Sequence, residues 1–190
     1  MCALVAHVFF MAETEQTEKP DQTPEELFLA AYEEYADALL RHCMLRVRDR
    51  ELAKDIVQEA YSKTWVYMSE GKEIEYLRAF LYRVANNLII DWARKKKSSS
   101  LDTLMEDDGF EPVDENVKDF ADVPAAREAL KLLGELDVMY RTAITMRYLD
   151  EMSPREIAEA LGVSENVVSV RIHRGIEKLS KMARRQPGQG

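Results

Sequence analysis

Side chains suited to reading DNA bases gather in the last quarter of the chain. At helical spacing the sequence places Asn166, Ser169, His173 and Arg174. A guanidinium can form paired hydrogen bonds with guanine, an amide can do so with adenine, and a hydroxyl or imidazole can reach a base or a phosphate. From Val167 onward there are six basic residues and one acidic residue. This local excess of positive charge predicts contact with nucleic acid, although the whole chain carries a net charge of −9.

Two short helices with a tight turn between them are predicted to position these side chains. Ser153 can cap the first helix, Pro154 suits its first turn, and Glu156 completes a capping box. Gly162 supplies the left-handed residue that ends this helix, and Ser164 can cap the second. The pattern predicts a helix-turn-helix whose second helix lies in a major groove. The residues expected to face inward on that second helix are Val167, Val168, Ile172, Ile176 and Leu179.

Apolar residues at helical spacing predict five further helices upstream. They span about residues 23–47, 49–68, 74–97, 125–136 and 137–149. No stretch has the alternation of a strand, and no internal repeat is visible. The sequence therefore predicts an all-α fold made of two small helical bundles joined by an acidic flexible linker.

The remaining segments are polar or short. Residues 98–123 hold one basic and nine acidic residues and are expected to be the linker, while residues 1–24 are expected to be a disordered extension. The apolar start is too short to span a bilayer, which predicts no membrane insertion, and translation could begin at Met11. A membrane-associating role for this start is the less favoured alternative.

Neither a metal site nor a catalytic site is predicted. The two cysteines, Cys2 and Cys43, have no CxxC spacing, and the pair His42 and Cys43 is expected to pack in a core because neighbouring helical residues point in different directions. No glycine-rich phosphate loop or nucleophile set is present, so we expect no cofactor, no small-molecule substrate and no enzymatic activity. Few cysteines fit a cytoplasmic protein.

Two patterns in the first bundle have more than one interpretation. Asp55, Gln58 and Glu59 share one face of a helix, which predicts either a solvated surface or a protein-docking surface. The 74–97 helix combines aromatic and basic residues, including Phe80 and Trp92, which suits either core packing or the stacking of unpaired bases beside phosphates. Its last turn ends in the basic run 94–97, which suits either the helix dipole or phosphate contact.

Together these segments resemble a known family. The sequences DIVQEAY at 55–61 and FLYRVANNLIID at 80–91 resemble domain two of bacterial sigma factors, and the helix-turn-helix resembles their domain four. With no domain three between them, the chain resembles an extracytoplasmic-function (ECF) sigma factor of the two-domain type. The resemblance implies domain two at 25–97, the linker at 98–123 and domain four at 124–185.

The resemblance also implies a function and residue roles. It implies a subunit that directs RNA polymerase core to particular promoters, helps to melt them, serves in a stress response and is held inactive by an anti-sigma factor. The implied polymerase contacts are the β′ clamp helices and the β flap, with Asp55, Gln58 and Glu59 on the clamp helices. The −10 element would be bound by Gly71, Phe80, Arg83, Asn86, Asn87, Arg94, Lys95, Lys96 and Lys97. The −35 element would be bound by Ser164, Asn166, Ser169, Arg171, His173, Arg174 and Lys178.

Some positions depart from the family pattern. Position 86 is Asn where the family often has a basic residue, and position 80 is Phe where Trp is frequent. Ser169 and Val170 replace a more usual pair of basic residue and serine, which predicts an unusual −35 sequence. Two alternatives remain: a sigma mimic that sequesters an anti-sigma factor, and a plain helix-turn-helix regulator.

Overall fold

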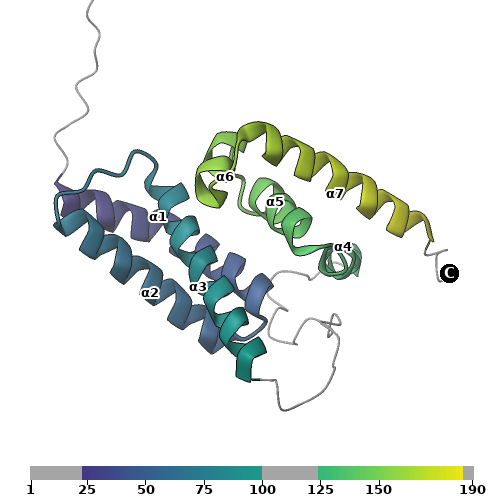
Figure 1. Cartoon of the computed structure of the whole chain (residues 1–190), viewed down its shortest axis with the longest axis horizontal. Helices are drawn as coiled ribbons and strands as arrows, with labels where there is room; N and C mark the ends of the chain where they lie inside the picture. The colour runs from purple at the N-terminus through teal and green to yellow at the C-terminus, as the bar shows by residue number, and fades with distance from the viewer. Residues whose placement is uncertain (1–22, 100–123, 186–190) are drawn as a thin grey trace, which may run out of the picture.

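The computed structural model describes residues 23–99 and 124–185, and within these ranges it contains seven helices and no strand (Figure 1). They are α1 (Pro24–Val47), α2 (Arg50–Ser69), α3 (Leu77–Ser99), α4 (Pro124–Gly134), α5 (Val138–Tyr148), α6 (Pro154–Leu161) and α7 (Glu165–Arg185). The all-α prediction is confirmed. The predicted extension and linker lie outside the described residues.

Local capping signals set most helix ends where the sequence predicts them. At the start of α1, the Thr23 hydroxyl accepts from the Glu26 amide at 3.2 Å, and the Glu26 carboxylate accepts from the Thr23 amide at 3.0 Å. Asp49 caps α2 through the Leu52 amide at 3.0 Å. Each cap satisfies backbone donors that the first helical turn leaves unpaired. Three predicted bounds differ from the structure by two or three residues: α3 begins at Leu77 and ends at Ser99, and α4 ends at Gly134.

The first three helices pack side by side into one bundle. Helix α2 lies along α1, and α3 contacts both of them (Figure 1). The centre of the bundle is filled by fully buried apolar side chains such as Leu39, Leu81 and Tyr82. Each such residue contributes about 1.5–3 kcal/mol by leaving water. This bundle holds α2 and α3 rigidly enough for their outer faces to act as binding surfaces.

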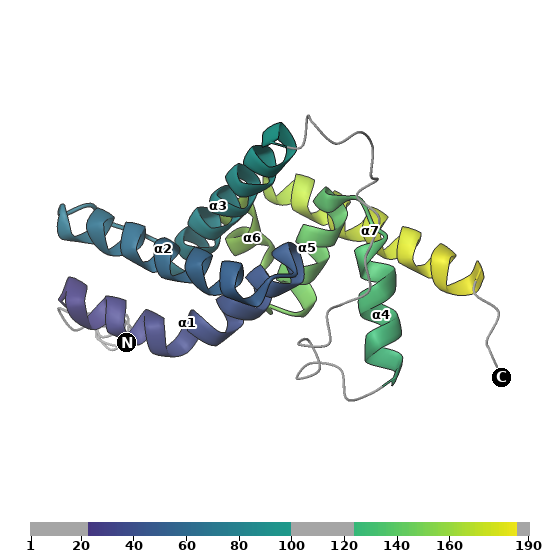
Figure 2. The ribbon, with the colours of Figure 1, turned by 90° about the horizontal axis from the view of Figure 1, so that it is seen from below.

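The last four helices form a second unit that packs on the first. Helix α7 crosses α5 and α6, and α6 lies against α3 (Figure 2). Met146, Met152 and Ile157 of the second unit belong to the same continuous core as the first bundle. The sequence predicted two bundles but did not predict this direct contact between them.

Candidate nucleic-acid and protein interfaces

The helix-turn-helix has the geometry that its sequence predicts. Ser153 and Glu156 form the reciprocal capping box of α6, with hydrogen bonds of 3.2 and 2.8 Å. Gly162 has φ +63°, the left-handed conformation that a Cβ disfavours, and it turns the chain into α7. The Ser164 hydroxyl then accepts from the Val167 amide at 3.3 Å and caps α7.

The outer face of α7 presents the predicted base-reading side chains to solvent. Asn166, Ser169, His173 and Arg174 are all exposed, and Arg171 is half-buried. The Ser169 hydroxyl donates to the Glu165 carbonyl at 3.0 Å, a bond within the helix that leaves its lone pairs accessible. The structure thus brings together an amide, a guanidinium and an imidazole on one accessible helix surface.

The inward face of α7 is narrower than predicted. Val168 is fully buried, but Val167 is 38% exposed and Ile176 is 40% exposed, so the prediction that these two residues face inward is wrong. Gly175 is buried instead, and a Cβ placed there would lie 2.5 Å from Cδ1 of Ile144. The buried stripe of α7 therefore runs through Val168 and Gly175, and Val167 and Ile176 lie on opposite flanks of it, because positions nine apart in an α-helix point about 180° apart.

Lys178 already has a partner within the protein. Its ammonium forms an ion pair with the Asp137 carboxylate and lies 4.6 Å above the Tyr140 ring. The hydrogen bond to Asp137 raises the pKa of Lys178, and the same bond lowers the pKa of Asp137. Both side chains are exposed, so a phosphate can compete for the ammonium.

The acidic and amide face of α2 is also open. Asp55, Gln58 and Glu59 are exposed, and Glu59 pairs with Lys63 at 2.9 Å across one helical turn. Exposed pairs of this kind hold their side chains weakly, so Glu59 can exchange Lys63 for another cation. The face can serve as a protein-docking surface without any rearrangement of the bundle.

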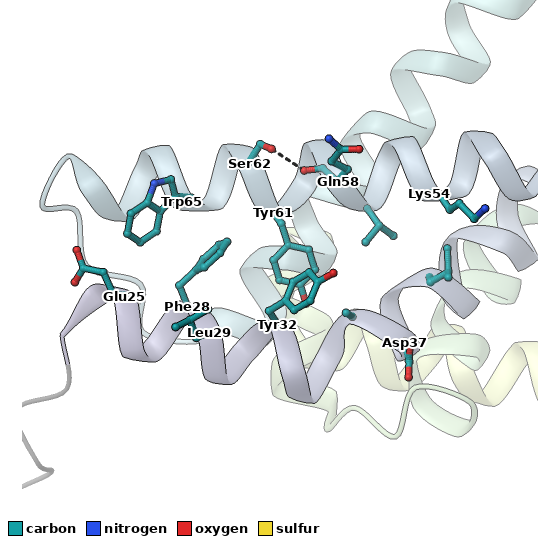
Figure 3. Close-up of a pocket in the computed structure, with 13 residues that line it drawn as sticks. Glu25, Phe28, Leu29, Tyr32, Asp37, Lys54, Gln58, Tyr61, Ser62 and Trp65 are labelled. Carbon is teal, nitrogen blue, oxygen red and sulfur yellow. Dashed lines mark hydrogen bonds between the residues drawn. The ribbon is translucent and has the colours of Figure 1, made fainter.

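A largely apolar groove runs beside this face, between α1 and α2. It has a volume of about 740 Å³, and Figure 3 shows aromatic side chains from both helices lining it. The ring of Phe28 contacts that of Trp65 at a tilt, with centroids 5.1 Å apart, and Tyr32 meets Tyr61 edge-on at 5.0 Å. The Tyr61 hydroxyl donates to the Ala31 carbonyl at 3.1 Å. Further lining residues are Glu25, Leu29, Ala36, Asp37, Leu40, Lys54, Val57, Gln58 and Ser62.

The groove and the predicted acidic face form one continuous surface, because Gln58 belongs to both. The sequence pattern does not predict this groove. The aromatic residues follow helical spacing, but the same spacing is typical of a core, and only the packing of α1 on α2 leaves Tyr32 53% exposed.

The basic end of α3 projects from the bundle into solvent. Arg94, Lys95 and Lys96 are exposed, as is Asn87 earlier in the helix, while the side chain of Lys97 lies outside the described residues. Arg94 pairs with Asp91 at 3.3 Å. In the same turns, Lys96 lies 5.2 Å above the Trp92 ring. These cations are positioned to follow a phosphate backbone.

The other end of α3 lies beside the α2–α3 loop. Gly71 has φ +76° and is exposed in this loop. Phe80 is half-buried and packs on Tyr67 at 4.9 Å. Two of the predicted −10 residues are thus placed near a turn that an unpaired base could reach.

Two predicted −10 residues are occupied within the protein. Asn86 is only 5% exposed, and its Oδ1 accepts from Arg46 at 3.1 Å while its amide donates to the Tyr82 carbonyl at 2.9 Å. Arg83 donates to the backbone carbonyl of Glu159 at 2.8 Å and pairs with the Glu159 carboxylate at 3.0 Å. Helix α6 therefore covers Arg83, whereas the partners of Asn86 come from α1 and from α3 itself.

A buried polar pair joins α1 to the segment between α5 and α6. His42 is 0% exposed and Asp150 is 4% exposed, and Nδ1 of His42 lies 2.7 Å from Oδ2 of Asp150. Next to them, the Arg46 guanidinium donates to the Thr142 hydroxyl at 2.7 Å. Burial, with a smaller contribution from the charge of Arg141, lowers the pKa of Arg46 to about 10. The core location of His42 follows from its position on the apolar face of α1, but nothing in the sequence pairs it with a residue 108 positions away.

The described residues hold no group of three histidine, cysteine or carboxylate side chains that could bind a metal ion. Within the same residues, no helix is both long enough and apolar enough to span a membrane.

Comparison with known proteins identifies the two units. Residues 31–99 match the model of Sigma-70 region 2, and residues 126–179 match that of Sigma-70, region 4. The ECF RNA polymerase sigma factor SigW of Bacillus subtilis is 31% identical over 182 residues, which cover 89% of this chain and 94% of SigW. The chain belongs to the ECF sigma factors. The RNA polymerase sigma-E factor of Streptomyces coelicolor is 30% identical over 152 residues, 78% of this chain and 83% of that protein.

Solved structures share the fold of this sigma factor. The sigma factor RpoE of Bartonella quintana, in complex with the anti-sigma factor NepR, superposes with a TM-score of 0.65 at 18% identity, covering 84% of this chain and 98% of that one. CnrH, in complex with the cytosolic domain of CnrY, superposes with a TM-score of 0.62 at 21% identity, covering 86% of this chain and 91% of that one. The predicted family, all-α fold and sigma-factor function are therefore confirmed.

Proposed function

We propose that this sigma factor binds polymerase core through α2 and holds promoter DNA through α3 and α7. The observation that carries the proposal is the presence of two different exposed surfaces in one chain. One is the acidic and amide face of α2 with its adjoining aromatic groove, and the other is the base-reading face of α7. A plain helix-turn-helix regulator needs only the second surface.

Helix α2 is the proposed docking surface for core polymerase, at the clamp helices of β′. Asp55, Gln58 and Glu59 provide charge and hydrogen-bonding capacity, and the groove beside Gln58 provides apolar area from Phe28 and Trp65. Central aromatic anchors surrounded by polar groups are typical of protein interfaces. Acidic residues at the rim also select a basic partner and speed its association.

Charge reversal on α2 tests this assignment. Replacing both Asp55 and Glu59 with Arg should weaken binding to purified core polymerase by about tenfold or more, because two attractive contacts become repulsive. Glu33→Arg makes the same change at an exposed position of α1 that does not line the groove, and should bind like the unaltered chain. Equal losses from both changes would contradict a specific docking surface.

Helices α3 and α7 are the proposed contacts to the −10 and −35 elements. On α7, Arg174 and Asn166 would read bases while Lys178 and Arg171 would hold the backbone. On α3, the exposed Arg94, Lys95 and Lys96 would follow the phosphates, with Asn87 and Phe80 beside the unpaired base, and Gly71, Arg83, Asn86 and Lys97 complete the proposed set. Melting would be driven by binding energy that offsets an unstacking cost of a few kcal/mol for a flipped base.

Polymerase would supply the chemistry, so the sigma factor itself would have no enzymatic activity and would act in the cytoplasm with no cofactor. The complexes of RpoE with NepR and of CnrH with CnrY support regulation of this chain by an anti-sigma protein. Contact of the helix-turn-helix unit with the β flap would complete the holoenzyme. Co-expression with a candidate anti-sigma protein should reduce core binding in proportion to complex formation.

A further inference from the structure

One residue in the middle of the base-reading face of α7 is apolar. Val170 is 40% exposed and has no hydrogen-bonding group in its side chain. Its exposed neighbours one turn before and one turn after are Asn166, His173 and Arg174, all of which carry hydrogen-bonding groups. A valine therefore occupies a position on this face where a polar side chain would be better solvated.

Packing within the protein does not account for this valine. Helix α7 meets the rest of the second unit through the buried stripe that contains Val168 and Gly175. Positions two apart in an α-helix point about 160° apart, so Val170 points almost directly away from the fully buried Val168. Its side chain is directed away from the core and toward the surface that the proposed function assigns to DNA.

Val170 lies in a row of three side chains along the outward face. Asn166 and Arg174 are four positions before and after it, so each lies about 6 Å away along the helix axis on the same face. Val167 is 38% exposed one turn earlier and widens the apolar surface. The row lies in the N-terminal half of α7, which begins at Glu165, and this is the part of a second helix that contacts base edges in helix-turn-helix proteins.

The major groove offers one methyl group to such a side chain. Its base edges present hydrogen-bond donors and acceptors, and thymine adds the C5-methyl group. A valine that contacts this methyl group removes apolar surface from water on both partners. Against a donor or acceptor the same valine would displace water without replacing its hydrogen bond, which is unfavourable. Both effects favour thymine at the base pair that Val170 faces.

We propose that Val170 is a specificity-determining residue of the −35 surface, and that it reads the C5-methyl group of a thymine between the positions read by Asn166 and Arg174. This assignment rests on the proposed function, because it requires that α7 binds the −35 element. An amide pairs best with adenine and a guanidinium with guanine, so the thymine is expected inside the element and not at its edge.

Promoter binding by the assembled holoenzyme tests the assignment. The probe is a duplex promoter fragment whose −35 element has been located by run-off transcription with core polymerase and the full chain. Each thymine of the element, on either strand, is replaced in turn with deoxyuridine, which lacks only the C5-methyl group. With the unaltered chain, one replacement inside the element should weaken binding by about fourfold in fluorescence anisotropy, the effect of exposing one buried methyl group.

Two variants show whether that thymine is read by Val170. Val170→Ala and Val170→Ser should each bind the thymine fragment about four- to tenfold more weakly, and should bind the thymine and deoxyuridine fragments alike, because the methyl group has lost its partner. The matched control is Val66→Ala, which shortens a valine that is 54% exposed on α2. It should keep both the affinity and the fourfold response of the unaltered chain. Circular dichroism checks that each variant is folded.

The outcomes distinguish the assignment from the function on which it rests. A −35 element without a thymine whose methyl group affects binding would overturn the assignment of Val170. An equal response to deoxyuridine in the Val170 variants and the unaltered chain would overturn it too. In both cases promoter-specific transcription by the unaltered chain would leave the proposed function standing. Absence of that transcription would overturn the proposed function and the assignment together.

Discussion

Removing the buried carboxylate of Asp150 should destabilise both helical units together. In the structure Asp150 is 4% exposed and its partner His42 is 0% exposed, and Nδ1 of His42 lies 2.7 Å from Oδ2 of Asp150. Asp150→Ala removes the acceptor and leaves a ring nitrogen of His42 buried without that partner. An unsatisfied buried polar group costs about 1–3 kcal/mol, and the broken contact itself adds about 1 kcal/mol. We expect the free energy of unfolding to fall by about 2–4 kcal/mol.

Asp150→Asn should cost less, about 1 kcal/mol, because the amide oxygen can still accept from Nδ1 of His42. The matched control is Asp137→Ala, which removes an exposed carboxylate paired with Lys178 and should cost less than about 1 kcal/mol. His42→Ala combined with Asp150→Ala should cost less than the sum of the single changes, with a coupling of about 1–3 kcal/mol.

Urea unfolding followed by circular dichroism measures these values. The unaltered chain should unfold in one transition, because residues of α5 and α6 share a continuous core with α1–α3. A stabilising role for the His42–Asp150 pair would be contradicted if the free energy of unfolding of Asp150→Ala lay within about 0.5 kcal/mol of that of the unaltered chain. A loss no larger than that of Asp137→Ala would contradict it as well.

Three further changes test other parts of the structure. Burial raises the pKa of Cys43 from its ordinary value of about 9 to about 12, so in a Cys2→Ser background the thiol should react with a disulfide reagent only as fast as the chain unfolds. The folded state then holds more protons than the unfolded state between these values, so the free energy of unfolding should fall as pH rises from about 9 toward 12, as measured by urea titrations at each pH. Gly162→Ala should lower the free energy of unfolding by about 1 kcal/mol in a urea titration, because φ is +63° while no atom lies within 4 Å of the added Cβ. An unchanged free energy of unfolding would contradict this backbone cause. Arg174→Ala should weaken binding to a −35 duplex by about 1–3 kcal/mol in fluorescence anisotropy and leave core polymerase binding unchanged, whereas equal loss of both would contradict separate surfaces.

The features that the sequence predicts well are those set by neighbouring residues. The capping boxes at Thr23 and Ser153 and the left-handed Gly162 depend on contacts three or four positions apart, so α1 and α6 begin where predicted. The exposure of Asp55, Gln58 and Glu59 follows equally well from helical periodicity.

Features that depend on contacts between helices were not predictable in this way. The inward direction predicted for Val167 and Ile176 is wrong because periodicity does not give the width of the buried stripe, which in the structure follows Val168 and Gly175, where α7 packs on Ile144 of α5. The pairing of His42 with Asp150 joins positions that no local pattern relates. Asn86 illustrates the same limit, because its motif is recognisable from sequence while its partner Arg46 comes from a different helix, α1, 40 positions away.

Transcription from promoter fragments tests whether this chain directs core polymerase to particular promoters. Purified core polymerase, the full chain and a library of genomic promoter fragments are combined, and run-off transcripts are sequenced from their 5′ ends. We expect transcripts that start at a common distance from shared −35 and −10 elements. They should disappear when the chain is omitted or replaced by the variant that carries both Asp55→Arg and Glu59→Arg. Transcripts that are independent of the chain, or a chain that binds core polymerase yet selects no promoter, would contradict that role.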